Sequence, residues 1–466
     1  MALGKSGPKQ GEFWVTVSEL PTSPGHPFYS KLNEILRGAD FDAWVEGLCE
    51  EYYAKNTGRP GIPPGVYFRM LFAGYFEGIQ SQRGIAWRCS DSLSLRSFLG
   101  LRATDESPHH SSLTRVRKRL PQEVHHAVFE FVLRVAIERG LLNGKTVAVD
   151  STTLEANAAM KSIVCKDSGE DYKEYIRRLA EAEGIEEPSD EDLRRFDKRR
   201  KGKKTSNKDW ESATDSDSRI ARMKDGRTHL AYKAENTIDL ETDMVISADV
   251  YHGDRGDTDT LTESLVHAQN TLLDCDSEAT IEECVADKGY HSAKLLADLE
   301  AIGLRGYIPE PEQRYDRRWT DKPEGQKEAV YRNRRRVRGK RSKALQRKRS
   351  ELVERSFAHV CETGGGRRTW LRGLVAVTKR YLIQVAARNL GAIMRAAFGV
   401  GTARSLQGGR EGDIGIGKAL MACLFAVVSV IERFSAAPMT IFAIPSLMMT
   451  AAKIFATEFS VSPRSI

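Results

Sequence analysis

The chain has 466 residues, of which 40 % are hydrophobic and 29 % charged, a globular balance that allows two or three domains. Its seven cysteines form no Cys-x-x-Cys pair, which argues against a zinc centre and against a secreted disulfide framework. The first residues show no basic-then-apolar signal pattern. We therefore expect a cytoplasmic protein.

Two apolar stretches lie near the C-terminus. Residues 419–431 are uncharged but too short to cross a bilayer, which takes about 20 apolar residues. Residues 434–452 are long enough, but Pro438 and Pro445 interrupt them. We expect a buried helix pair and no membrane span within a C-terminal tail, residues 401–466, whose role the sequence does not indicate.

The net charge of +7 is mild, but the basic residues are unevenly distributed. Residues 331–350 carry eleven Lys or Arg and no acid, and residues 191–208 carry nine bases against three acids. One such block is equally typical of a solvated loop. Two blocks close to acidic motifs favour a polyanionic partner, and we expect nucleic acid.

The first third of the chain has a helical pattern. Residues 1–27 are an irregular lead-in, and residues 28–140 are expected to form a helical N-terminal domain that binds DNA. Residues 66–80 form one candidate helix. A second follows Pro121, with Val124, Val128 and Val132 at helical spacing.

A short basic helix is expected at residues 111–120, with Leu113, Val116 and Leu120 on its inner face. It resembles the second helix of a helix-turn-helix, which would present a row of bases to DNA. Those bases are Arg115, Lys118 and Arg119. Short basic helices are common, so a purely structural role is the alternative.

From residue 141 to about 400 the pattern changes to α/β. A buried strand at residues 146–150 ends on Asp150, and a short one at 282–286 ends at Asp287. A charged insertion, helical or loose, occupies about 155–225. The other expected elements are a hairpin (229–238 and 244–251), helices (259–273, 292–302, 343–359 and 375–397) and a strand (305–308). This order predicts a mixed sheet flanked by helices.

Three acids stand out against this background: Asp150, Asp287 and Glu354. Carboxylate oxygens are the ligands that Mg²⁺ or Mn²⁺ prefers, and two ions roughly 3.5–4 Å apart can serve phosphodiester chemistry. Each acid alone is ambiguous, because strand-end aspartates cap turns and helix glutamates are often solvated. Glu351, one turn before Glu354, is the alternative ligand. We expect the three carboxylates to converge.

Three motifs resemble those of bacterial insertion-sequence transposases of the DDE superfamily. They are Ala148-Val149-Asp150-Ser151-Thr152, Ala286-Asp287-Lys288-Gly289-Tyr290 and Glu351-Leu352-Val353-Glu354-Arg355-Ser356-Phe357. The resemblance covers about residues 28–400 and implies an RNase H-like catalytic domain after the helical N-terminal domain. It also implies that Asp150, Asp287 and Glu354 hold two Mg²⁺ or Mn²⁺ ions.

The reaction implied is cleavage at the element ends, followed by attack of the 3′-OH groups on target DNA. The implied partners are double-stranded DNA and a second copy of the chain, in a bacterial cytoplasm at the nucleoid. The alternatives are a metal-dependent nuclease without strand transfer and a non-catalytic DNA-binding relative.

The sequence departs from this family around Glu354. Many relatives carry a Tyr and an Arg before the Glu and a Lys after it, whereas Arg347, Ser350 and Cys361 stand here. Other bases are then expected to make the phosphate contacts. The candidates are Arg347, Arg349, Arg367, Arg368, Lys379 and Arg380.

Overall fold

The computed structural model describes residues 26–54, 61–102, 104–201, 206–223, 226–312, 319–320 and 322–403. These residues belong to one compact unit. Nearly all of the predicted lead-in and tail, including both apolar stretches at 419–452, lies outside the described residues. No helix in the described part of the chain is long and apolar enough to span a membrane.

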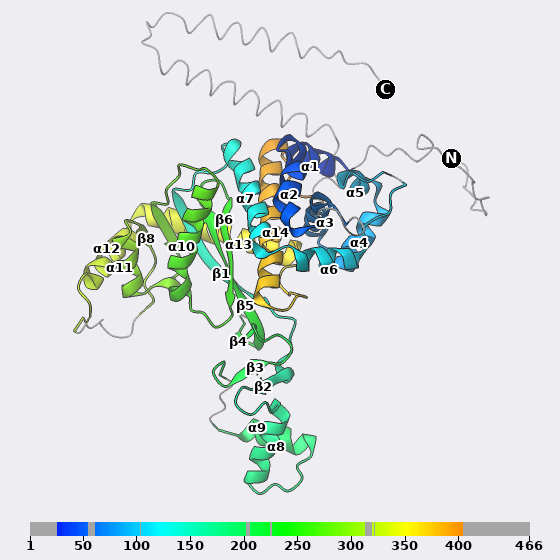
Figure 1. Cartoon of the computed structure of the whole chain (residues 1–466). Helices are drawn as coiled ribbons and strands as arrows, with labels where there is room; N and C mark the ends of the chain where they lie inside the picture. The colour runs from blue at the N-terminus through cyan, green and yellow to red at the C-terminus, as the bar shows by residue number, and fades with distance from the viewer. Residues whose placement is uncertain are drawn as a thin grey trace, which may run out of the picture. The chain divides into compact units, whose positions relative to one another are not determined.

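The N-terminal region is helical, as predicted (Figure 1). Its helix at residues 66–80 is α3, which begins at Pro64, and the helix after Pro121 is α7. The short basic helix is α6, whose inner residues Leu113, Val116 and Leu120 are buried as expected. Its N-cap is His109, whose side chain accepts the backbone N–H of Ser111. The helices are α1 (Pro27–Gly38), α2 (Phe41–Cys49), α3 (Pro64–Glu77), α4 (Gln82–Asp91), α5 (Leu93–Phe98), α6 (His110–Arg119) and α7 (Gln122–Glu138), with a 3-10 turn, η2 (Glu50–Tyr52).

The sheet that follows is mixed, as predicted. In the described residues it has six strands in the order β4-β5-β1-β7-β8, with β6 also paired to β5. The β5–β6 hairpin and the β1–β5 pair are antiparallel, whereas β7 lies parallel to β1 and β8 parallel to β7. The strands are β1 (Thr146–Glu155), β4 (Arg219–Arg222), β5 (Thr228–Asp239), β6 (Val245–His252), β7 (Glu283–Ala286) and β8 (Arg305–Tyr307).

Helices cover both faces of this sheet (Figure 1). On one face Val147 and Val149 of β1 share a core with Leu261 and Leu265 of α10. On the other face Ala148 and Leu154 belong to a core that includes the N-terminal helices and α14. The helices are α10 (Asp257–Asp274), α11 (Ala293–Ala301), α12 (Gln326–Arg338), α13 (Lys340–Phe357) and α14 (Leu374–Phe398), with short turns η4 (Lys288–Tyr290) and η5 (Ala358–Thr363). The predicted regions 28–140 and 141–400 therefore share one hydrophobic core.

The charged insertion contains strands as well as the expected helices. Capping boxes at Asp171 and Ser189 begin its two helices, and Ile176, Ala180 and Leu193 form a small core of their own. Figure 1 shows α8 and α9 beyond the end of the sheet at which β4 lies. The elements are η3 (Met160–Ser162), β2 (Ile163–Cys165), α8 (Tyr172–Ala182), α9 (Asp190–Arg199) and β3 (Trp210–Ser212).

One sequence prediction was wrong, and one helix was not predicted. Strand β1 does not end at Asp150 but continues to Glu155, because it pairs with β5 over its whole length and keeps Thr152 and Leu154 buried. The basic residues before the expected helix at 343–359, for which no element was predicted, form a helix of their own, α12, at residues 326–338. That helix buries Ala329 and Val330. Arg332, Arg335 and Arg338 are exposed, whereas Arg334 and Arg336 are half-buried.

Candidate functional site

Asp150 and Asp287 lie next to one another on neighbouring parallel strands. The last residue pair between β1 and β7 is Val149 with Ala286, and the two aspartates follow directly. The carboxylate of Asp150 accepts the backbone N–H of Ser151 at 2.8 Å, and that of Asp287 accepts the N–H of Lys288 at 2.6 Å. Sequence reasoning thus identified two acids that the fold brings to one place, although only Asp287 ends its strand.

The face of the sheet that Asp150 occupies is the one covered by α13 and α14. Asp150 pairs across the antiparallel ladder with Asn236, so their side chains share a face. Asn236 accepts a hydrogen bond from the Tyr381 hydroxyl on α14 at 2.9 Å. Asn236 also donates to the Ser356 hydroxyl of α13 at 3.4 Å, so helix α13, which carries Glu354, packs on the same face of the sheet as Asp150.

Arg349 of α13 contacts Asp150 directly. Its Nη1 lies 2.7 Å from Oδ2 of Asp150, and its Nε donates to Gln346 at 3.0 Å. Gln346 in turn donates to the carbonyls of Ala286 and Tyr307, at 3.2 and 2.7 Å. These bonds fasten α13 to the ends of β7 and β8, and they place a cation on one of the two aspartates.

Glu354 is exposed and does not join the aspartates in this conformation. Its carboxylate accepts the Ser350 hydroxyl at 3.1 Å, while Glu351 forms an ion pair with Arg355. At 3.6 residues a turn, Glu354 lies about 100° from the buried Val353 and Glu351 about 160°, which favours Glu354 over Glu351. Within the described ranges, no group of three His, Cys, Asp or Glu could hold a metal ion. The expected convergence of three carboxylates is therefore absent here.

The residues fit a divalent cation in part. Asp150 and Asp287 offer hard oxygen donors at adjacent strand positions, which is the donor chemistry that Mg²⁺ or Mn²⁺ requires. Glu354 reaches such a site only if its side chain leaves Ser350.

Sequence reasoning missed a buried ionic network on the opposite face of the sheet. Glu235 of β5 is fully buried beside Ser151 and accepts hydrogen bonds from three hydroxyls, at 2.6–2.9 Å. Lys233 lies 3.1 Å from Glu235 and 2.8 Å from Asp257. The hydroxyls belong to Thr260, Ser264 and Tyr290. A Lys and a Glu two residues apart in a strand, among the apolar Leu230, Ala231, Tyr232 and Ala234, were the available signal.

This network joins the two aspartate motifs. Tyr290 belongs to the Asp287 motif, and burial and the charge of Glu235 raise its pKa well above the ordinary value. Asp257 accepts the hydroxyl of Ser151, the neighbour of Asp150, at 3.0 Å. Because both motifs are anchored on Glu235 and Asp257, the network fixes the spacing of β1 and the turn after β7.

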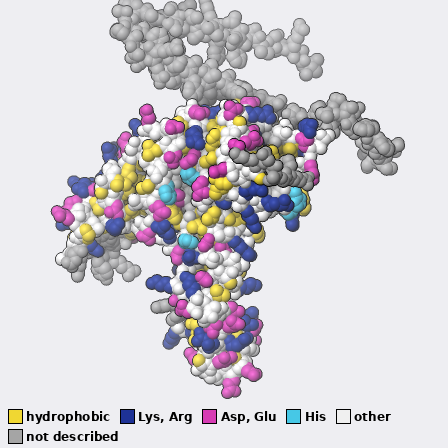
Figure 2. All heavy atoms as spheres, in the orientation of Figure 1, with side chains coloured by type: hydrophobic (Ala, Val, Ile, Leu, Met, Phe, Trp, Pro, Cys, Tyr) yellow, Lys and Arg dark blue, Asp and Glu magenta, His cyan; other side chains and the backbone are white. Residues whose placement is uncertain are grey.

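The predicted DNA contacts differ in accessibility. Figure 2 shows Lys and Arg side chains gathered over α4 and α6, where the exposed Arg115, Lys118 and Arg119 lie. Arg119 also stacks on the ring of Tyr53, with its guanidinium carbon 4.7 Å from the ring centre. Arg347 is exposed on α13. These four side chains are accessible to a polyanion.

Lys379 and Arg380 of α14 are held differently. Lys379 is buried and donates to the carbonyls of Leu120, at 2.8 Å, and Arg117, at 3.3 Å. Arg380 donates to the carbonyl of Gly365 at 2.9 Å. Both residues tie α14 to neighbouring segments. A contact with duplex DNA at these two positions stays a prediction.

Two family models match the chain. The Transposase domain (DUF772) matches residues 18–119, and the Transposase DDE domain matches residues 143–390. No curated protein and no solved structure matches the chain. The second family model covers more than half of the sequence. The mixed sheet of the chain and the helices that flank it have an RNase H-like order. The chain therefore belongs to the DDE transposases of insertion sequences.

Proposed function

We propose that this transposase cuts DNA at the ends of its element and joins the exposed 3′-OH groups to target DNA, in a reaction that depends on a divalent metal. The observation that carries the proposal is the placement of Asp150 and Asp287 side by side on β1 and β7. Bound Mg²⁺ or Mn²⁺ would activate the attacking oxygen and stabilise the leaving oxygen at phosphorus.

The side chains have distinct roles in this proposal. Asp150 and Asp287 hold the metal, and Glu354 completes the site when its carboxylate turns away from Ser350. Arg349 keeps the Asp150 carboxylate in position until metal binds. The network around Glu235 holds the two aspartate motifs at constant spacing from the far side of the sheet.

DNA binding would rely on the exposed bases of α6 and on Arg347, which neutralise backbone phosphates without reading sequence. Because two element ends must react together, we propose that a homodimer forms on DNA. The site of action would be the bacterial cytoplasm, at the nucleoid.

A metal-dependent nuclease is the second candidate, since two metal-binding aspartates serve hydrolysis as well as transesterification. The test uses pre-cleaved element ends with a free 3′-OH, a supercoiled target plasmid and Mg²⁺. A transposase gives end–plasmid joints, and Asp287→Asn abolishes them. Nicked plasmid without joints would support the nuclease and contradict strand transfer.

A further inference from the structure

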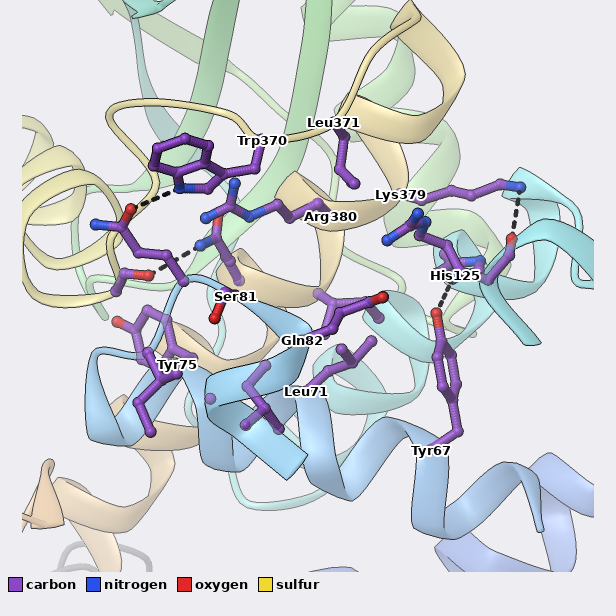
Figure 3. Close-up of a pocket in the computed structure, with 18 residues that line it drawn as sticks. Tyr67, Leu71, Tyr75, Ser81, Gln82, His125, Trp370, Leu371, Lys379 and Arg380 are labelled. Atoms are coloured by element: carbon purple, nitrogen blue, oxygen red, sulfur yellow. Dashed lines mark hydrogen bonds between the residues drawn. The ribbon is translucent and has the colours of Figure 1, made fainter. Parts of the chain in front are cut away.

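A cavity of about 250 Å³ lies between α14 and the N-terminal helices (Figure 3). Helices α3, α4, α6 and α7 contribute to its walls, together with the segment between η5 and α14. Nothing in the proposed chemistry uses it. Its size is at the small end for a ligand pocket, so it fits one small unit and excludes a duplex.

The cavity is positively charged. Its lining includes Arg117, Lys379 and Arg380, and it includes no Asp or Glu among the described residues. The bonds that Lys379 and Arg380 make go to backbone carbonyls, which carry no net charge. The Arg117 guanidinium has no hydrogen bond or ion pair within the part of the chain that the structure describes. Burial lowers the pKa of all three groups, and the charge of Arg117 adds to this at the other two.

Aromatic groups line the same cavity. The indole of Trp370 is half exposed, and its Nε1 donates to Gln80 at 2.9 Å. Figure 3 shows Arg380 extending toward Trp370, with Tyr75 nearby. The loop that carries Trp370 is closely packed, because a Cβ on Gly364 would lie only 2.5 Å from the Tyr75 ring. The Arg368 guanidinium lies over one face of the Trp370 ring, 5.1 Å from its centre, so a flat group would stack on the other face, beside a bound anion.

The wall that carries Trp370 is joined to the strand of Asp150. Glu155, the last residue of β1, donates to the carbonyl of Arg367 and accepts the N–H of Thr369, both at 2.9 Å. Five residues of extended strand separate Asp150 from Glu155, which is about 17 Å. That length is about five base pairs of duplex, so a DNA molecule bound at Asp150 is long enough to extend to the segment that Glu155 holds.

We propose that this cavity binds the terminal nucleotide of a DNA strand through its 5′-phosphate, with the base against Trp370. A terminal phosphate carries a charge of about −1.5 to −2, more than an internal diester, and so suits several cations without an acid. This inference rests on the proposed function in one respect, because it takes DNA as the substrate.

The first test uses the wild-type chain and a short single-stranded oligonucleotide with a 3′ fluorophore. Fluorescence anisotropy compares the 5′-phosphate form with the 5′-hydroxyl form at one salt concentration. We expect the 5′-phosphate to tighten binding by about tenfold or more. Equal affinities would overturn the proposal. Inorganic phosphate that displaces the oligonucleotide as effectively as a 5′-nucleotide would also overturn it, because the base would then contribute nothing.

Variants locate the effect. Arg117→Gln reduces the 5′-phosphate preference to less than about threefold, and Trp370→Leu weakens binding of both forms by about fivefold or more. The control is Arg139→Gln, which removes the same charge about 21 Å along α7 from His125 and retains the preference. Arg380→Gln removes both the charge and the bond to the Gly365 carbonyl, so it can disturb the loop. Arg380→Lys keeps the charge and is the second variant at this position. A preference that survives both Arg117→Gln and Arg380→Gln would contradict this location.

Failure of this inference is distinguishable from failure of the proposed function. Asp150→Asn abolishes DNA cleavage in the proposal above, but it leaves the 5′-phosphate preference intact. Cleavage without that preference would refute the cavity assignment alone. A preference without cleavage would refute the catalytic proposal alone.

Discussion

The guanidinium of Arg349 lies 2.7 Å from the carboxylate of Asp150, although 199 residues separate them in sequence. Arg349 is largely buried at this contact and Asp150 partly so. The same arginine donates a hydrogen bond to Gln346, which in turn donates to the carbonyls of Ala286 and Tyr307 at the ends of β7 and β8. A cation fixed on a candidate metal ligand means that metal and arginine compete for one carboxylate.

This competition predicts the effect of Arg349→Gln on metal binding. Removing the cation takes away one competitor for the Asp150 carboxylate, so Mn²⁺ should bind about three- to tenfold more tightly in the absence of DNA. Isothermal titration calorimetry measures the change. The control is Arg347→Gln, an exposed neighbour on the same helix, with unchanged Mn²⁺ affinity. Weaker Mn²⁺ binding by Arg349→Gln would mean that the arginine organises the ligand rather than competing for it.

The ionic network predicts a large stability effect. Lys233→Met removes the cation between Glu235 and Asp257, and a buried carboxylate without its partner costs about 3–5 kcal/mol. Urea unfolding followed by circular dichroism measures the loss. Lys294→Met, which breaks the exposed pair with Asp298, should leave the urea midpoint close to that of the wild type. A small effect of Lys233→Met would show that the network contributes little to folding.

His125 predicts a loss of stability in acid. Burial lowers its pKa to about 4 from the ordinary 6.5. In the unfolded chain His125 takes up a proton below pH 6.5, whereas in the folded chain it does so only near pH 4. Its contribution is therefore complete above pH 6.5 and is lost as the pH falls to 4, by about 3 kcal/mol.

His125→Gln, which keeps one donor and one acceptor, should flatten the unfolding free energy between pH 6.5 and 4. His267 is the control of opposite sign, because its hydrogen bond to Asp249 raises its pKa. Its contribution is present below pH 6.5 and is lost as the pH rises through the folded pKa. If the unfolding free energy of His125→Gln falls between pH 6.5 and 4 as much as that of the wild type, His125 is not the source of the loss.

Salt dependence separates the exposed bases from the buried ones. Arg115→Gln with Lys118→Gln should reduce the slope of log K for duplex DNA against log[salt] by about 2, since each phosphate contact contributes about 0.9. On a closed circular duplex, which has no terminal phosphate to enter the cavity, Lys379→Gln should leave the slope unchanged. It should also lower the unfolding free energy, because Lys379 donates to the carbonyls of Arg117 in α6 and of Leu120 after it. A slope that falls with Lys379→Gln on this circular duplex would place that residue on internal phosphates.

Much of the fold could be predicted from the sequence because its signals are local. The helical spacing in α7 and α14 and the apolar run that precedes Asp287 each specify their own element. Strand β1 was predicted too short because Ser151, Thr152 and Thr153 are typical of a turn as well as of a strand. Only their pairing with β5 distinguishes the two.

The site was less accessible to sequence reasoning because its contacts are long-range. Asp150 and Asp287 could be predicted from their motifs, whereas the argument from strand ends holds for Asp287 alone, because β1 continues beyond Asp150. The role of Arg349 could not, because a basic helix suggests phosphate and does not indicate which base faces inward. The burial of Lys379 could not be predicted either, because its partners are backbone carbonyls, which have no sequence signature.

Cleavage by the purified chain tests the central claim most directly. A supercoiled plasmid carrying both element ends is incubated with Mg²⁺, and strand breaks at the ends are quantified for the wild type, Asp150→Asn and Asp287→Asn. The matched control is Asp276→Asn, at a positive φ of 57° that asparagine tolerates. We predict Mg²⁺-dependent breaks at the ends, a loss on the order of 10³-fold in each of the two variants, and wild-type cleavage in the control. Undiminished cleavage in Asp150→Asn or Asp287→Asn would contradict the account.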